Sequence, residues 1–314
     1  MRLRKRNFQF EEDYWRLRTF LRDVTLRNDL QQLSWCAARL DYWRWHVAPI
    51  TDQKQDEAAI FLWETPGGEI AAALNPEDKG EAFLQIHPDH QSPKLLDAMI
   101  ESAEAHLYRT TEENKKRLVV WAHEHDSVRE AVLAERGFQK LENPDWQERQ
   151  RQRWLEQPLP GVKPAEGYTI RSLGGAEEIP SRSWASWRAF HPDSPDEDYQ
   201  GWDWYPVNIQ TQPMYRRDLD IVAIAPDGEV AAFTTLWYDD VTRCGYFEPV
   251  GTVPELQRKG LGKAVMVEGM RRIKEMGALA VSVSGFSVPA NKLYAAVVSE
   301  DCLVNIPWVK EWEG

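Results

Sequence analysis

Cysteine and long apolar runs are both scarce in this sequence. The three cysteines, Cys36, Cys244 and Cys302, are scattered without any metal-binding spacing, and an odd number suits a reducing compartment. No apolar stretch is long enough to cross a membrane, and the basic residues 1–6 lead into polar rather than apolar residues. We therefore expect a cytoplasmic protein with no signal peptide, no membrane association and no metal.

Positive charge is also in deficit. The 38 lysines and arginines are outnumbered by 50 aspartates and glutamates, which gives a formal net charge of -12. Such a surface disfavours nucleic acid and anionic membranes as main partners and mildly favours cationic small molecules. The length of 314 residues and the apolar content of 42% allow two domains with real cores.

A glycine motif lies between a predicted strand and a predicted helix. Residues 246–253 read as the strand, and residues 263–276 place apolar side chains on one helical face. Between them stands Gln257-x-x-Gly260-x-Gly262, whose glycines let the backbone approach a ligand closely. The unpartnered N–H groups at the start of a helix suit an anion such as a pyrophosphate, although a lone Gly-x-Gly can equally be a tight turn.

With its flanking strand and helix, this motif resembles the pyrophosphate arm of the GNAT superfamily of N-acetyltransferases. A second motif, from Ser287 through Ala290 to Tyr294, resembles the family's Asn-x-x-Ala-x-x-x-Tyr helix start, with serine in place of asparagine. The usual Gly-Phe after the tyrosine is missing. The resemblance implies acetyl-CoA as the acyl-donor substrate and a tandem arrangement similar to that of mycothiol synthase.

The sequence repeats itself once. Residues 68–72 and 228–232 are nearly the same hairpin, and the period of about 160 residues indicates two copies of one domain. Strands that alternate with helices imply an α/β fold. We expect two tandem GNAT-like domains, each a mixed, mostly antiparallel sheet flanked by helices.

The two copies are not equivalent. In an alignment without gaps Lys94 takes the place of Gly260, and Leu133 stands where the tyrosine should be. We therefore expect a degenerate, non-catalytic domain at residues 1–150, a linker at residues 151–167 and a catalytic domain that binds acetyl-CoA at residues 168–314. The polar run at residues 147–153 reads as linker and exposed helix.

The resemblance assigns roles to residues of the second copy. Tyr294 is the candidate general acid, with a core aromatic as the alternative, and the backbone N–H of Val253 is the expected oxyanion donor. Glu248 and Tyr246 share one face of their strand and are candidates for the general base, although Glu248 reads equally well as a solvated carboxylate. The remaining contacts to the coenzyme are expected from Val250, Gly251, Thr252, Val253, Gln257, Arg258, Lys259, Gly260, Leu261, Gly262, Lys263, Ala264, Ser287 and Asn291.

Acidic and aromatic residues gather in the segment 190–205. Carboxylates and ring faces both attract a cationic amine, although a solvated acidic loop followed by packed tryptophans is an equal alternative. The candidate substrate-binding residues are Asp193, Asp196, Glu197, Asp198, Trp202, Trp204 and Tyr205.

These observations favour an acyltransferase, an acetyl-CoA-dependent N-acetyltransferase that acts on the primary amine of a small, cationic molecule. One alternative is a non-catalytic sensor or interaction module that binds acyl-CoA. Another is a protein lysine or N-terminal acetyltransferase, since an acidic loop accepts basic peptides equally well.

Overall fold

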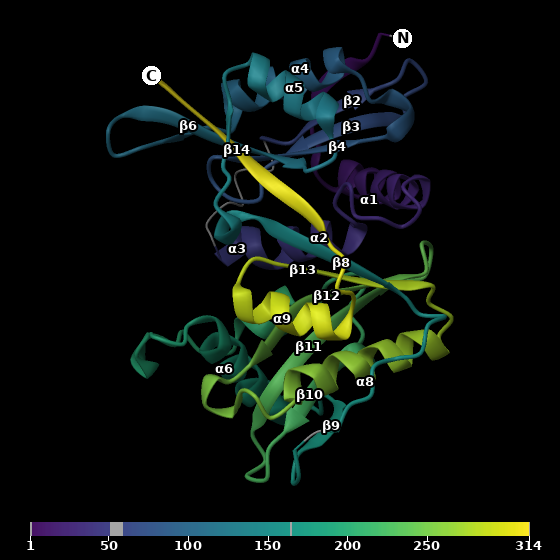
Figure 1. The fold of residues 1–314 in the computed structure, drawn as a ribbon, viewed down its shortest axis with the longest axis vertical. Helices are drawn as coiled ribbons and strands as arrows, with labels where there is room; N and C mark the ends of the chain where they lie inside the picture. The colour runs from purple at the N-terminus through teal and green to yellow at the C-terminus, as the bar shows by residue number, and fades with distance from the viewer. Residues whose placement is uncertain (1, 51–58, 164, 314) are drawn as a thin grey trace. The chain divides into compact units, whose positions relative to one another are not determined.

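The computed structural model describes residues 2–50, 59–163 and 165–313. Its contacts divide the chain into two compact units, and the division does not follow the order of the sequence. Unit 1 comprises Met1–Gln150, Gly285–Ser287 and Leu303–Gly314, whereas unit 2 comprises Arg151–Ser284 and Val288–Cys302. The last strand thus belongs to unit 1, although it follows unit 2 along the chain (Figure 1).

Unit 1 is built on a mixed sheet with strand order β1-β2-β3-β4-β6-β14-β8. Neighbouring strands in this order are antiparallel except β4 and β6, which are parallel. Its elements are β1 (Arg4–Asn7), α1 (Phe10–Arg27), α2 (Ala37–Tyr42), α3 (Ala48–Ile50), β2 (Phe61–Glu64), β3 (Ile70–Asn75), β4 (Glu81–Ile86), α4 (Pro93–His106), β5 (Arg109–Thr110), β6 (Lys115–His123), α5 (Ser127–Glu135), β7 (Gln139–Lys140), the first part of β8 (Glu148–Trp154) and β14 (Leu303–Glu313).

The sheet of unit 1 is covered by helices on both faces (Figure 1). Successive side chains of a strand point to opposite faces, so Phe61 and Trp63 of β2 pack in the core formed with α4 and α5. Leu62, which lies between them, packs in the core formed with α1 and α2. Burial on both faces explains why these strands are almost uniformly apolar.

Unit 2 repeats this architecture with strand order β8-β13-β12-β11-β10-β9. Strands β9 to β12 are antiparallel neighbours, and β12 pairs in parallel with β13. Its elements, after the end of β8, are β9 (Thr169–Ser172), α6 (Ile179–Phe190), α7 (Trp204–Asn208), β10 (Asp220–Ile224), β11 (Val230–Asp239), β12 (Cys244–Thr252), α8 (Leu261–Glu275), β13 (Ala280–Gly285) and α9 (Val288–Val297).

The helices of unit 2 also lie on two faces of its sheet (Figure 1). Phe247 of β12 packs in one core with Met270 of α8 and Val297 of α9. Phe233 of β11 lies under Arg182 of α6, whose guanidinium carbon is 3.8 Å from the centre of the ring. Among the described residues, no helix is both long and apolar enough to span a membrane.

The polar run at residues 147–153 is a strand, β8, and not the exposed helix that its composition suggests. Two of its charged residues, Glu148 and Arg151, are buried and have hydrogen-bond partners on distant segments. Glu148, which is 1% exposed, accepts hydrogen bonds from Arg39 at 2.7 Å and from Asn305 at 3.2 Å. A polar sequence can therefore occupy the interior of a sheet where each buried charge is paired.

Candidate active site in unit 2

The start of α8 offers unpaired backbone donors. Gly260 caps this helix with φ 75°, in the left-handed region that glycine adopts without strain. The first hydrogen bond of the helix runs from Ala264 N–H to Gly260 O at 3.0 Å, and glycine has no side-chain oxygen to cap the preceding N–H groups. Leu261, Gly262 and Lys263 therefore present N–H groups for an anion at this end of the helix.

Two further glycines bring the surrounding elements close together. A Cβ atom on Gly262 would lie 3.2 Å from a methyl carbon of Leu293 in α9 and 3.2 Å from Thr252 Oγ1 in β12. A Cβ atom on Gly251 would lie 2.3 Å from the ring of Phe233. A side chain at position 251 would overlap the ring of Phe233, and one at position 262 would be packed tightly against α9 and β12.

Strands β12 and β13 pair only over a short stretch. Cys244–Thr252 forms the whole of β12, but its parallel pairing to β13 in the described structure ends where Tyr246 faces Ser282. On its other side β12 stays paired to β11 as far as Thr252. The second half of β12 therefore exposes one backbone edge to an extended ligand.

The backbone N–H of Val253, which was the expected oxyanion donor, does not face the open edge of β12. Val253 N–H donates to Ala231 O at 2.9 Å and is thus engaged within the sheet. Because bonded and non-bonded pairs alternate along an antiparallel ladder, Val250 and Thr252 direct their N–H groups away from β11, toward the open edge. These two groups can contact a ligand, whereas the N–H of Val253 cannot.

Tyr294 lies on α9, in the core cluster that also contains Phe247. Burial raises the pKa of its hydroxyl, and the negative charge of Glu248 raises it further. Tyr294 therefore keeps its proton at neutral pH and is able to donate it. The influence of Glu248 also shows that the two predicted catalytic residues lie near one another.

Glu248 sits at a bulge in β12, where it and Pro249 together lie opposite Thr235 of β11. Its backbone carbonyl accepts a hydrogen bond from the indole N–H of Trp237, and its side chain is partly exposed. Tyr246, by contrast, is buried, with its hydroxyl 3.2 Å from Ser284 Oγ on β13. Of the two candidates for the general base, Glu248 is the more accessible.

Several of the residues predicted to contact the coenzyme already have partners. The side-chain oxygen of the buried Asn291 accepts a hydrogen bond from Arg151 of β8 at 2.5 Å, so it holds α9 against that strand. Lys259 donates to the hydroxyl of Tyr168 at 2.9 Å, and Gln257 Nε2 lies 3.4 Å from Thr252 O. Ser287 is exposed directly before α9. The backbone, more than these side chains, forms the candidate coenzyme site.

The predicted acceptor loop is largely exposed, with one exception. The four of its five carboxylates that were predicted to bind substrate are exposed, Trp202 is 40% exposed, and Trp204 is held by a hydrogen bond to Gly201 O at 2.9 Å. Tyr205 is 1% exposed and donates its hydroxyl to Asp220 at 2.6 Å. The prediction that Tyr205 contacts substrate is thus wrong, because its ring and hydroxyl belong to the interior. The four carboxylates in question are Asp193, Asp196, Glu197 and Asp198.

A buried polar cluster surrounds Asp220, and no sequence pattern predicts it. Asp220 accepts hydrogen bonds from both Tyr205 and Tyr215, and Arg182 lies 3.4 Å away; Arg182 and Asp220 are both completely buried. Arg182 also donates to Thr235, which faces the bulge at Glu248. Nothing in the local sequence marks these residues, because they come from several separate elements and loops.

The comparisons with known proteins agree with this geometry. Residues 177–297, which include the α8 start and the β12 edge, match the model of the acetyltransferase (GNAT) family. This part of the chain is therefore similar to the GNAT acetyltransferases. A search of curated protein sequences gives no match.

Solved structures extend the likeness to both units. A GCN5-related N-acetyltransferase from Sphaerobacter thermophilus is 17% identical, with 98% of this chain and 95% of that chain covered and a TM-score of 0.63. A tandem GNAT protein from the clavulanic acid biosynthesis pathway is 14% identical, with coverage of 99% and 98% and a TM-score of 0.62. A GNAT-family acetyltransferase from Colwellia psychrerythraea is 12% identical, with coverage of 99% and 100% and a TM-score of 0.58. Such likeness shows a shared fold, and the predicted α/β fold with tandem GNAT-like domains is confirmed.

Unit 1 has the GNAT architecture without the free helix start. Helix α4 is capped by Ser92, whose Oγ accepts the N–H of Leu95 at 3.3 Å, and Pro93 at its first position has no N–H at all. The cap of α4 is thus Ser92. The alignment without gaps places Lys94 opposite Gly260, two residues later than this cap. The first turn of α4 retains few donors for an anion.

Unit 1 also closes the gap between its own parallel strands. Pairing of β4 with β6 ends at Ala82 and Val120, and beyond it Arg129 of α5 donates to Trp121 O at 3.1 Å and approaches Leu84 O at 3.4 Å. Arg129 stands four residues before Leu133, where unit 2 has the small Ala290 four residues before Tyr294. A side chain of unit 1 therefore occupies the gap that unit 2 leaves open.

Metal ligands do not gather in the described residues. No group of three or more histidine, cysteine, aspartate or glutamate side chains there is placed to hold an ion.

Proposed function

We propose that unit 2 transfers an acetyl group from acetyl-CoA to the primary amine of a small, cationic molecule in the cytoplasm. The observation that carries this proposal is the free N–H array at the start of α8, adjoining the open edge of β12. A helix start of this kind suits a pyrophosphate, and a strand edge suits an extended arm that carries amides.

The residues present fit this coenzyme. The N–H groups of residues 261–263 would hold the pyrophosphate, and the space beside Gly260 and Gly262 would be filled by any larger side chain. The edge of β12 from Val250 to Thr252 would run beside the pantetheine arm. The coenzyme supplies an acetyl group as a thioester, whose thiolate is a tolerable leaving group because a thiol has a pKa of about 8.5.

The residues around this edge have complementary roles. Val250 N–H points toward the open edge, and its side chain packs on the cluster that contains Tyr294, so we assign to it the donor for the carbonyl oxygen. Tyr294 is protonated and donates its proton to the departing sulfur. Glu248 accepts a proton from the attacking amine, directly or through one water molecule.

The proposal that the acceptor is cationic depends on the exposed carboxylates of the segment 190–205. A cationic amine would be attracted by the field of Asp196, Glu197 and Asp198, which form one 3-10 turn, and by the exposed ring of Trp202. An extended basic peptide would meet the same charges. Protein acetylation therefore remains the second candidate function.

Thiol release from acetyl-CoA tests the proposal on a panel of small primary amines, neutral alcohols and basic peptides. Turnover confined to small cationic amines is expected. Faster turnover on peptides would instead establish a protein acetyltransferase. Binding of coenzyme A with no turnover on any acceptor would make unit 2 a sensor and overturn the proposal.

The acidic turn has its own test. In the triple variant Asp196→Asn, Glu197→Gln, Asp198→Asn, the Michaelis constant for the amine should rise several-fold, while binding of acetyl-CoA is unchanged. The effect should shrink with added salt, because the screening length falls from about 10 Å at 0.1 M to about 3 Å at 1 M. The matched control neutralises three exposed acids of unit 2 away from this turn, Asp227, Glu229 and Asp240. An equal rise in both triple variants, or no rise in the first, would make the turn a solvated surface.

A further inference from the structure

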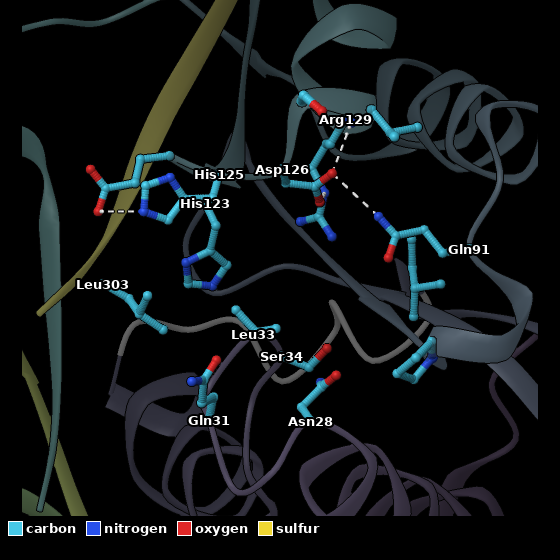
Figure 2. A pocket seen from close by; sticks show the side chains of 15 residues that line it. Asn28, Gln31, Leu33, Ser34, Gln91, His123, His125, Asp126, Arg129 and Leu303 are labelled. Atoms are coloured by element: carbon cyan, nitrogen blue, oxygen red, sulfur yellow. Dashed lines mark hydrogen bonds and ion pairs between the residues drawn. The ribbon is translucent and has the colours of Figure 1, made fainter.

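Unit 1 contains a pocket of about 370 Å³ at the carboxyl ends of its parallel strands. Four segments line it: the loop after α1, the end of β4 with the loop that follows, the end of β6 with the start of α5, and Leu303 at the start of β14 (Figure 2). Its volume falls within the range of about 300–1,000 Å³ in which small-molecule sites are found. The pocket belongs to the unit that the proposed acetyl transfer does not use.

His123, the last residue of β6, reaches into this pocket. Figure 2 shows its ring directed toward Leu33 and Gln31 on the opposite wall, and the residue is only 8% exposed. Its Nδ1 is buried and makes no hydrogen bond within the described part of the chain. A buried polar atom without a partner is costly in a folded protein and calls for a ligand or a water molecule.

The protonation state of His123 defines what that partner must be. Burial first, and the positive charge of Arg129 second, lower the pKa of the ring to about 4, whereas a hydrogen bond to the backbone of Gln32 raises it in part. The ring is therefore neutral at pH 7. Because Nδ1 is the unpartnered nitrogen, the bond to Gln32 uses the other nitrogen and leaves Nδ1 as an acceptor. A ligand must thus bring an O–H or N–H to this atom.

The charged groups around the pocket already have partners within unit 1. Asp126 caps α5 by accepting the N–H of Arg129 at 3.0 Å, accepts Gln91 Nε2 at 3.2 Å, and lies 3.1 Å from Arg129 Nε (Figure 2). Glu124 accepts the N–H of Val304 at 3.0 Å. With one arginine and two carboxylates engaged in this way, the site favours neither a cation nor an anion.

The opposite wall is polar but uncharged. Asn28, Gln31 and Ser34 line it, and Leu33 contributes an apolar surface between them (Figure 2). Side-chain amides and hydroxyls both donate and accept hydrogen bonds, so this wall complements groups of the same kind.

We propose that this pocket binds an uncharged small molecule that carries hydroxyl or amide groups, one of which donates a hydrogen bond to His123 Nδ1. This site differs in kind from the coenzyme site proposed in unit 2, because Arg129 fills the gap between the strands and Ser92 caps the start of α4. Unit 1 then contributes a binding site of its own to the tandem protein.

Ligand-observed saturation-transfer NMR on the full chain tests the proposal with four probes. Methyl α-D-glucopyranoside represents the hydroxyl class and N-acetylglycinamide the amide class, whereas choline and glucose 6-phosphate represent cations and anions. Transfer to at least one neutral probe is expected. Two variants test whether this transfer arises from binding in the pocket. His123→Gln keeps a polar group near the bond to Gln32 but removes the Nδ1 acceptor, and Val128→Trp places an indole over the pocket from a partly exposed position.

Both variants should weaken binding of the neutral probe at least tenfold, while the matched control Val241→Trp, at an exposed position of unit 2, keeps it. Thermal unfolding and acetyl transfer should be unchanged in Val128→Trp, which separates loss of the pocket from loss of the fold. The proposal is overturned if neither neutral probe binds, if a charged probe binds as tightly and is lost in the same variants, or if neutral binding survives both substitutions.

Discussion

At the scale of single residues, Tyr294 has the most direct test. Its buried hydroxyl keeps a proton that the proposed reaction would hand to the sulfur. Tyr294→Phe keeps the ring in its core cluster but removes the proton, so we expect turnover to fall about ten- to a thousandfold. Affinity for acetyl-CoA, measured by calorimetry, should hardly change. Unaltered turnover would reduce Tyr294 to a packing residue and leave protonation of the thiolate to water.

The pH profile of the same variant gives a second readout. Burial and the charge of Glu248 raise the pKa of Tyr294 above the ordinary tyrosine value of about 10. The hydroxyl therefore remains a proton donor, and wild-type turnover should not decline between about pH 8 and pH 10. If the turnover of wild type and of Tyr294→Phe both declined in that range, the decline would be due to the titration of another group.

His123 links stability to pH in a predictable direction. Its pKa is about 4 in the folded chain and about 6.5 when unfolded, so the unfolded state takes up a proton first as pH falls. The free energy of unfolding is then unaffected above pH 6.5 and decreases between pH 6.5 and pH 4, by about 2 kcal/mol from pH 7 to pH 5. Urea unfolding at these two pH values should show this loss in wild type and a smaller loss in His123→Gln. Equal losses in the two proteins would mean that His123 already titrates normally in the folded state.

At the scale of elements, the start of α8 decides whether unit 2 binds coenzyme A. Gly260→Leu places a branched side chain beside the free N–H groups and at φ 75°, which costs about 1–2 kcal/mol for a non-glycine residue. Binding of coenzyme A should be abolished. Gly228→Leu is the matched control, because Gly228 has φ 92° in a hairpin turn with open space around it. Calorimetry should find binding in the control alone, and retained binding in Gly260→Leu would remove this helix from the site.

The elements that the sequence predicts best are those with a local signal. The helix at 263–276 and the strand at 246–253 follow from periodicity and flanking glycines, and the structure has them as α8 and β12 within two residues at each end. Strand β8 has no such signal, because Glu148 and its neighbours are buried through partners more than a hundred residues away. The positions of Val253 N–H and Tyr205 likewise depend on sheet register and on Asp220, neither of which a local pattern contains.

At the scale of the whole molecule, the two units are expected to differ in coenzyme binding. Unit 1 fills its strand gap with Arg129 and caps α4 with Ser92, whereas unit 2 leaves both places open. Titration calorimetry should therefore give one coenzyme A per chain. A stoichiometry of two with equal affinities would show that the side chain of Arg129 moves aside readily.

Strand β14 has a consequence for the order in which this protein can be made. It pairs with β6 and β8 of unit 1, yet it follows every residue of unit 2 in the sequence. A ribosome therefore releases the amino-terminal unit with an open sheet edge and delivers the missing strand only after unit 2 has emerged. Unit 1 cannot mature co-translationally as a finished domain, and a gene fragment that ended before β14 would encode a protein with an exposed, aggregation-prone edge. The two units are therefore separate in the fold but interleaved in the sequence, so unit 1 cannot be expressed in full without the residues of unit 2.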